Sequence, residues 1–237
     1  MRMPLPRLAS DLIYLAKIAR SLRGKTKRQC PCCGQSGYFT AFGSPPRFEA
    51  RCPSCGALER HRLLMLLDQR HGLFRRDAEI LHFAPEPIVR DHLRRISKNY
   101  RSADLQPGRA DCQENIEALS FPDATFDHIV CIHVLEHVDD ARALSELRRV
   151  LKPGGSLIAM VPIIEGWERT YEDPSIVRPE GRDLHFGQHD HVRMYGRDFR
   201  DRVQRAGFVV EDLTGSGDDA VRYGLLRGET VFVCKPA

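Results

Sequence analysis

The sequence predicts an α/β protein whose main domain is a doubly wound, mostly parallel sheet, preceded by a small cysteine-rich module. Short apolar segments alternate with helical ones over residues 79–237, as in parallel sheets covered on both faces. Five of the eight cysteines lie in residues 30–55, outside this alternation. The length of 237 residues suits one mid-sized domain with an accessory module.

Composition excludes several classes of protein. Hydrophobic residues make up 42% and charged residues 29%, which supports a buried core and argues against wholesale disorder. The longest apolar run, near residues 157–164, is far shorter than the ~20 residues that cross a bilayer. Asp11 and Lys17 interrupt any signal-peptide core at the start of the chain. We therefore expect a cytoplasmic protein that is not an integral membrane protein.

Residues 1–29 are predicted to form a basic, amphipathic helical arm. They carry eight cations and one acid, a net charge of +7, whereas the whole chain carries +4. Apolar residues recur there at helical steps of four and three: Leu8, Leu12, Leu15, Ala19 and Leu22. Either this stripe packs on the body of the protein, or the arm contacts an anionic surface such as nucleic acid, a membrane or an acidic partner.

Residues 30–56 are predicted to form a zinc ribbon. Two CxxC pairs, Cys30/Cys33 and Cys52/Cys55, are each followed by glycine. Thiolates at this spacing reach one metal at ~2.3 Å, and four of them close the shell of a structural Zn²⁺. Cys32 is a spare thiol that could compete with Cys33. The alternative is a set of buried or redox-active cysteines.

Residues 57–78 are read as a linker helix, since neither glycine nor proline interrupts them before Gly72. Strands are expected after it at residues 80–84, 100–105, 126–133, 156–161, 208–213 and 230–234, and helices at 88–96, 140–150 and 195–206. Such sheets bind ligands beyond the carboxyl ends of their strands. Residues 82–87, 104–107 and 131–137 should therefore surround one crevice.

Two stretches carry a specific resemblance. Residues 121–138 read FPDATFDHIVCIHVLEHV, and residues 147–155 read LRRVLKPGG. This pattern resembles class I S-adenosylmethionine-dependent methyltransferases of the VLEHV type, similar to methyltransferase type 11, and the strand order extends it over about residues 79–236. It implies a Rossmann-like sheet of seven strands whose last strand is antiparallel, with S-adenosylmethionine as cofactor. The cysteine module resembles that of bacterial methyltransferases with an N-terminal zinc ribbon.

The first loop of the main domain departs from the family. Members usually carry GxGxG there, whereas this chain has Ala84, Pro85 and Glu86 and no glycine. Without glycine a positive φ is costly, so the approach to the cofactor must be different or weaker. Glu86 could accept from the cofactor's amino group, and Asp104 after the second strand could take both ribose hydroxyls. Alternatively, the loop is degenerate and the protein no longer binds cofactor.

The remaining cofactor contacts expected from the resemblance are Asn115 to the adenine amino group and Ile116 on the ring face. The sulfonium methyl is already activated, so positioning supplies much of the rate, and a base is needed only when the acceptor loses a proton. His133, at the end of its strand, is the candidate for cofactor contact or proton acceptor, or else a packed histidine. Glu136 and His137 are expected to cap or orient the following helix.

A histidine-rich insertion forms the second candidate region. His189, His191 and Tyr195 lie close together before the helix expected at residues 195–206. Three interpretations compete: recognition of the acceptor with a base, a second metal site using His189 and His191, or a polar lid without chemistry. Recognition of the acceptor is favoured, and no third metal ligand is evident.

These features predict a methyltransferase that uses S-adenosylmethionine and carries a structural Zn²⁺. The acceptor is not readable: RNA, a glycan or lipid-linked intermediate and a small molecule all stay open. The alternative is a non-catalytic binding or scaffold protein with a degenerate methyltransferase fold and a zinc ribbon.

Overall fold

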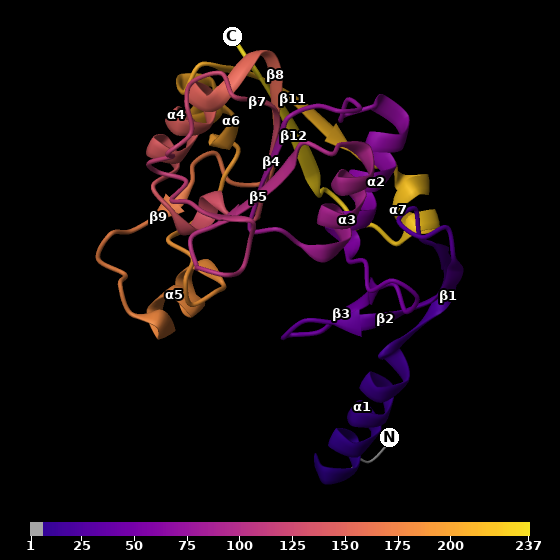
Figure 1. The fold of residues 1–237 in the computed structure, drawn as a ribbon. Helices are drawn as coiled ribbons and strands as arrows, with labels where there is room; N and C mark the ends of the chain where they lie inside the picture. Colours follow the sequence, from indigo (N-terminus) through magenta and orange to yellow (C-terminus); the bar gives the residue numbers. More distant parts are fainter. Residues whose placement is uncertain (1–6) are drawn as a thin grey trace. The chain divides into compact units, whose positions relative to one another are not determined.

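The computed structural model describes residues 7–237, which divide into two compact units (Figure 1). Unit one contains the chain up to Arg70 together with residues 215–229. Unit two contains residues 71–214 and 230–237. The chain therefore leaves unit two after residue 214 and returns to it at residue 230. The domain limits predicted at residues 29, 56 and 78 stay predictions.

Unit two is built on a sheet of seven strands in the order β11-β12-β8-β7-β4-β5-β6. The strands are β4 (Ile80–Phe83), β5 (Tyr100–Asp104), β6 (Cys112–Gln113), β7 (Phe126–Ile132), β8 (Leu151–Met160), β11 (Phe208–Thr214) and β12 (Thr230–Pro236). Five neighbouring strands, from β6 to β8, pair in parallel, whereas β12 is antiparallel to both β8 and β11. The predicted doubly wound sheet with an antiparallel last strand is confirmed.

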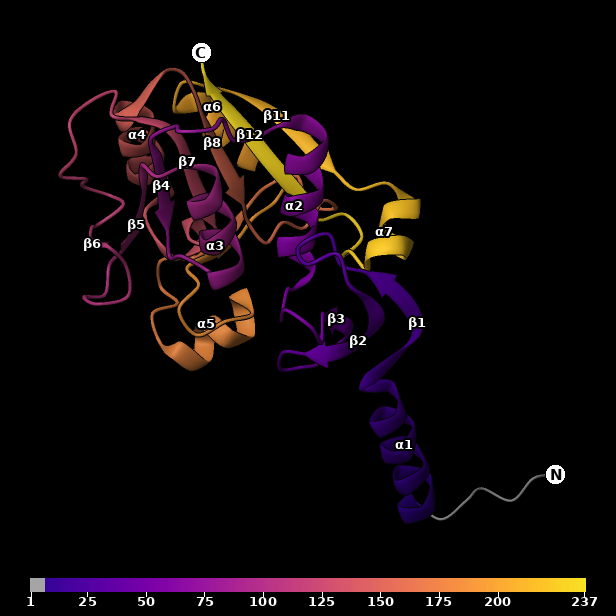
Figure 2. The ribbon, with the colours of Figure 1, turned by 45° about the vertical axis from the view of Figure 1, so that its right-hand side comes forward.

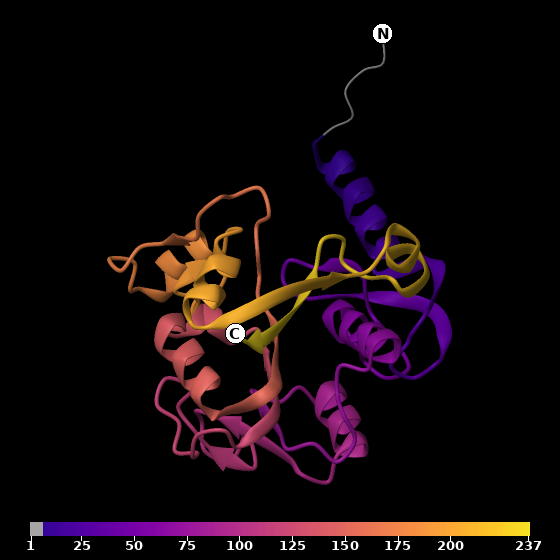
Figure 3. The same ribbon diagram turned by 90° about the horizontal axis from the view of Figure 1, so that it is seen from above.

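Helices cover both faces of this sheet. Figures 1 and 3 show α3 (Pro87–Ile96) on one face and α4 (Asp140–Val150) with α6 (Phe199–Arg205) on the other. All four residues of β4 are buried, as expected for a central strand without a solvent face. The shorter elements of unit two are the 3-10 helix η1 (Leu135–His137), α5 (Pro179–Phe186) and the ladder of β9 (Tyr171–Glu172) with β10 (Arg193–Met194).

Unit one is an antiparallel ribbon of β1 (Arg23–Gln29), β2 (Ser36–Phe42) and β3 (Arg47–Arg51). Its helices are α1 (Arg7–Ser21), α2 (Glu59–His71) and α7 (Gly217–Tyr223). Figure 2 shows α7 beside β1, so the segment that interrupts β11 and β12 packs on the ribbon. Helix α2 ends at His71 because Gly72 adopts a φ of +62°.

A buried arginine holds unit one together. Arg62 of α2 is fully buried, and its guanidinium lies 4.6 Å from the centroid of the Phe39 ring. It donates to the carbonyls of Ala50 and Ala57, at 2.8 and 2.6 Å, and to that of Tyr223 at 2.8 Å. One side chain thus ties α2 to the ribbon and to the end of α7, which assigns Arg62 a packing role.

The apolar stripe of α1 faces solvent. Leu12, Leu15 and Leu22 are 61, 59 and 46% exposed, and Ala19 is exposed as well. The side chain of Leu8 lies outside the described residues. Figure 1 shows α1 projecting beyond the three strands of the ribbon. None of the helices in the described part of the chain is both long and apolar enough to cross a membrane.

Candidate functional site

Unit two has a cavity of about 380 Å³ at the carboxyl ends of β4, β5 and β7. This is the crevice expected of an open parallel sheet, and its volume lies in the range of small-ligand pockets. Its walls come from the strand ends, the loops that follow them and the histidine-rich insertion. The lining residues include Phe83, Ala84, Ala103, Asp104, Leu105, Arg109, Glu114, Asn115, Ile116, His133, Val134, His137, Val138, Gln188 and Asp190.

The backbone at two of these positions is left-handed. Ala84, directly after β4, has a φ of +46°, and His133, directly after β7, has a φ of +52°. The amide of Ala84 donates to the carbonyl of Ala103 at 2.9 Å, and that of His133 donates to the carbonyl of Met160 at 2.8 Å. This conformation costs an L-residue about 1–2 kcal/mol, and such strain gathers at functional sites. The first loop therefore uses a positive φ without glycine.

Five of the predicted cofactor residues meet in this cavity: Ala84, Asp104, Asn115, Ile116 and His133. Pro85 and Glu86 are not among the lining residues, and Glu86 is the residue that precedes the first turn of α3. The backbone amide of Gln106 donates to Asp104 Oδ1 at 2.8 Å. This bond fixes the carboxylate at the end of β5, where it faces the cavity.

Sequence reasoning missed several lining residues. Arg109 and Glu114 lie in the loops around β6, and no motif marked them. Gln188 and Asp190 belong to the histidine-rich insertion, where His189, His191 and Tyr195 were the expected site residues. His137 lies in the range 131–137 that was expected around the crevice, and it lines the cavity, although its own expected role was to cap or orient the following helix. The signal for that range was its place at the carboxyl end of a parallel strand.

The three catalytic candidates of the insertion are placed differently from one another. His189 is exposed and is not among the lining residues. His191 is buried, with Nδ1 3.1 Å from the carbonyl oxygen of Phe186, and burial lowers its pKa. Tyr195 is fully buried away from the lining, and its hydroxyl lies 3.0 Å from both the Leu135 carbonyl and Asp140 Oδ2. Burial raises the pKa of Tyr195.

The insertion is tied to η1 by main-chain and charged contacts. The amide of Val192 donates to the carbonyl of Glu136 at 2.9 Å. Arg193 donates to the Leu135 carbonyl at 3.0 Å and to Glu172 Oε2 at 2.9 Å. Although burial raises the pKa of Glu172, the guanidinium groups of Arg202 and Arg193 lower it overall. The insertion is therefore a fixed wall of the cavity.

In unit one, four sulfurs lie at distances that suit one metal ion. The sulfurs of Cys30, Cys33, Cys52 and Cys55 lie within 4.8 Å of one another. Cys30 and Cys55 are 3.7 Å apart, and Cys33 and Cys52 are 3.9 Å apart. Tetrahedral bonds of ~2.3 Å to Zn²⁺ would separate neighbouring sulfurs by about 3.8 Å, so the donor set fits zinc. Cys32 is not part of the cluster.

The two knuckles share one local geometry. The amides of Gly34 and Gly56 donate to the carbonyls of Cys30 and Cys52 at 2.8 and 2.9 Å. Both glycines adopt a positive φ, +75° and +79°. That conformation reverses the chain directly after each pair and is the reason for glycine at these positions.

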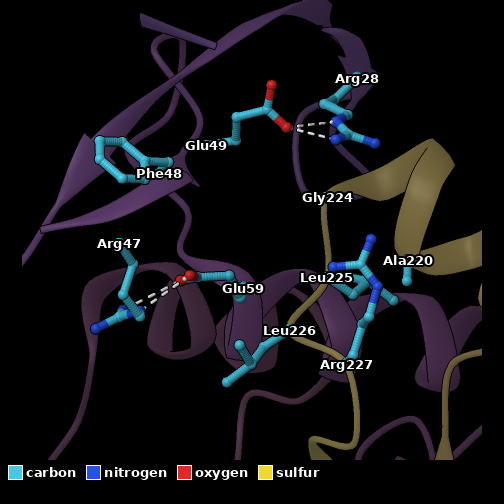
Figure 4. A pocket seen from close by; sticks show the side chains of 10 residues that line it. All are labelled: Arg28, Arg47, Phe48, Glu49, Glu59, Ala220, Gly224, Leu225, Leu226 and Arg227. Carbon is cyan, nitrogen blue, oxygen red and sulfur yellow. Dashed lines mark hydrogen bonds and ion pairs between the residues drawn. The ribbon is translucent and has the colours of Figure 1, made fainter. Parts of the chain in front are cut away.

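Unit one also has a cavity between β3, the start of α2 and the residues around the end of α7 (Figure 4). Two of its arginines form ion pairs with glutamates. Arg28 pairs with Glu49, and Arg47 donates to Glu59 at 3.0 and 3.2 Å. These ion pairs neutralise most of the positive charge at its wall. This cavity therefore binds an anion less favourably than three unpaired arginines would.

Comparison with known proteins finds a family profile, partial sequence matches and a similar fold. The profile of a methyltransferase domain matches residues 88–159. An uncharacterized protein of Methanocaldococcus jannaschii is 55% identical over 47 residues, 20% of this chain and 21% of that protein. The ubiquinone/menaquinone biosynthesis C-methyltransferase UbiE of Escherichia coli is 47% identical over 64 residues, 25% of this chain and 26% of the enzyme. The matched segments thus span about a quarter of these relatives.

A solved structure, that of a Pyrococcus horikoshii protein, aligns with 75% of this chain and 90% of its own. Its TM-score is 0.50 and its sequence identity is 18%. At that identity the similarity speaks for the fold alone.

Proposed function

We propose that this chain, whose sheet-bearing unit is a class I methyltransferase domain, transfers the methyl group of S-adenosylmethionine to an acceptor. The observation that carries the proposal is the cavity at the ends of β4, β5 and β7. It brings Asp104 together with the two left-handed residues Ala84 and His133. A left-handed backbone costs free energy, and it occurs here at two strand ends around one cavity. This favours a functional cofactor site over the alternative of a degenerate scaffold.

The lining residues suit the parts of the cofactor. The Asp104 carboxylate would accept from the ribose hydroxyls in charge-assisted bonds. Buried Ile116 would cover a face of the adenine, and the Asn115 amide would contact its edge. Ala84 leaves room for the methionine portion because its side chain is a single methyl group. The cofactor supplies an activated methyl group, and the protein supplies position.

A proton acceptor is available at the same cavity. His133 Nδ1 lies 3.1 Å from Glu136 Oε1, and the Glu136 side chain is fully buried. When Nδ1–H donates to this carboxylate, the lone pair of Nε2 is free to take a proton from the acceptor. Glu136 thus orients the ring, and His133 would serve acceptors that lose a proton on methylation.

Calorimetry with S-adenosylmethionine on the purified full chain tests the proposal. Asp104→Ala should weaken binding by about 1–3 kcal/mol, the cost of losing a charged hydrogen-bond partner. Asp123→Ala is the matched control, because Asp123 is exposed and does not line the cavity. Equal affinity in both variants would show that the ribose lies elsewhere. A wild-type chain that does not bind the cofactor would support the scaffold alternative.

Unit one adds two proposals. The four-cysteine cluster holds a structural Zn²⁺, because four thiolates leave no position open for chemistry. Helix α1 contacts an anionic surface through its basic residues, with exposed Leu12 and Leu15 as the apolar side of that contact. The nature of the acceptor, whether RNA, a glycan or lipid-linked intermediate or a small molecule, does not follow from these features.

A further inference from the structure

A second cluster of side chains that can act as metal ligands lies in unit two. Glu136 and His137 of η1 meet His191 of the insertion, and one ligand atom from each lies within 4.8 Å of the others. Two imidazoles and a carboxylate form a donor set that suits divalent metals of the transition series. No metal role was expected for Glu136 or His137 from the sequence.

The carboxylate of Glu136 has an unused oxygen. Its side chain is fully buried, and Oε1 faces His133 Nδ1. Within the described part of the chain, Oε2 has no hydrogen-bond partner. Burying a carboxylate oxygen without a partner is costly. A cation beside Oε2 would remove that cost.

Both histidines have an oxygen acceptor near Nδ1. His191 Nδ1 lies 3.1 Å from the Phe186 carbonyl, and His137 Nδ1 lies 3.4 Å from Asp190 Oδ2. Carbonyl and carboxylate oxygens only accept, so a proton on Nδ1 suits both contacts and would leave the lone pair of Nε2 for a metal. This arrangement of an outer acceptor on each imidazole is characteristic of metal-bound histidines.

The backbone holds the three side chains in place. The Val192 amide donates to the Glu136 carbonyl, so His191 is one residue from a main-chain bond to η1. The rings of His137 and His191 lie edge to face, with centroids 4.7 Å apart. A site held by such contacts is organised before a metal arrives, which favours affinity.

We propose that Glu136, His137 and His191 bind one divalent metal ion, of which Zn²⁺ is the best probe. Three protein ligands leave coordination positions on the metal open. His137 also lines the cavity at the carboxyl ends of β4, β5 and β7. An oxygen atom of the acceptor completes the coordination and is thereby oriented at the cavity wall. Metal binding stands on the geometry alone, whereas this role in orienting the acceptor rests on the proposed methyl transfer.

Equilibrium dialysis of the full chain against Zn²⁺, followed by elemental analysis, tests the site. The wild type should hold one more zinc per chain than Glu136→Gln and His191→Ala, which keep the ribbon zinc. His189→Ala is the matched control and should keep the wild-type content, because His189 is exposed and outside the cluster. Equal zinc content in the wild type and all three variants would overturn the proposal.

Two further measurements separate the possible failures. His137→Gln repeats the test at a partly exposed position, where the substitution is easier to accommodate than in the core. Calorimetry with S-adenosylmethionine on the same samples reports on the proposed function. Cofactor binding without the extra zinc would overturn the metal site alone. The extra zinc without cofactor binding would support the metal site and contradict methyl transfer.

Discussion

Replacing Ala84 by glycine should stabilise unit two. Ala84 holds a φ of +46° and is exposed, so removing its methyl group relieves strain without opening a cavity in the core. Left-handed backbone costs an L-residue about 1–2 kcal/mol, whereas glycine loses about 0.5–1 kcal/mol more conformational entropy on folding. The difference between these ranges predicts a net gain of about 0–1.5 kcal/mol in the free energy of unfolding, centred near 0.75 kcal/mol.

Urea unfolding followed by tryptophan fluorescence measures this gain. The chain has a single tryptophan, Trp167, which lies in unit two. Ala124→Gly is the matched control, because Ala124 has a φ of +51° and lies outside the cavity lining. Both variants should gain stability, while Ala141→Gly in the first turn of helix α4 should lose stability, by less than the ~1 kcal/mol that glycine costs in a helix interior.

The affinity for S-adenosylmethionine should distinguish Ala84→Gly from Ala124→Gly. Only Ala84 lines the cavity, so only Ala84→Gly should change the affinity for S-adenosylmethionine. A loss of stability in Ala84→Gly of the size seen in Ala141→Gly would refute the reasoning from backbone strain. Equal cofactor affinity in the wild type and Ala84→Gly would show that the methionine portion does not lie against this loop.

Three other predictions concern unit one. Cys52→Ser should release zinc and destabilise the ribbon, since structural zinc contributes folding free energy; elemental analysis that finds no zinc in the wild type would contradict this. Arg70 donates to both oxygens of Asp219, at 2.7 and 2.6 Å, and thereby holds its pKa well below the ordinary value. The depressed pKa adds stability above the unfolded-state pKa of about 3.9, which is lost as the pH falls through the folded-state pKa. Asp219→Asn should therefore lower stability by about 1–2 kcal/mol at pH 7, with a difference that closes in acid; thermal melts between pH 2 and 7 would reveal a pH-independent gap if this account were wrong. Deleting residues 1–21 should weaken binding to anionic phospholipid vesicles, most strongly at low salt; sedimentation with neutral vesicles is the control, and unchanged binding to anionic ones would remove α1 from the contact.

Patterns between residues close in the sequence predicted the cysteine cluster and the central strands of this protein. The CxxC pairs predicted a four-sulfur cluster, and the sulfurs lie together because each pair spans a single turn. The apolar runs predicted the buried central strands. The strand expected from residue 156 begins at Leu151. A register irregularity against β7 lets β8 continue through Gly154 and Gly155, which the sequence suggested as a turn.

The conformation of the first loop could not be predicted from the φ preferences of its residues. The absence of glycine implied that a positive φ would be avoided there, yet Ala84 adopts one. Pairing of β4 with β5 and β7 holds the end of the strand, and the bond from the Ala84 amide to Ala103 adds to this. Tertiary contacts of this kind can outweigh a conformational preference of 1–2 kcal/mol.

Of the two candidate metal sites, the sequence alone predicted the ribbon site, and only the tertiary structure revealed the second. Each cysteine pair is local, so spacing and a following glycine were enough to predict the ribbon site. The second cluster joins η1 to a distant insertion, and no periodicity links Glu136 or His137 to His191. The sequence paired His189 with His191 because alternate residues of an extended chain share a face. The chain turns at residues 189–190 instead, which leaves His189 exposed and buries His191 beside η1.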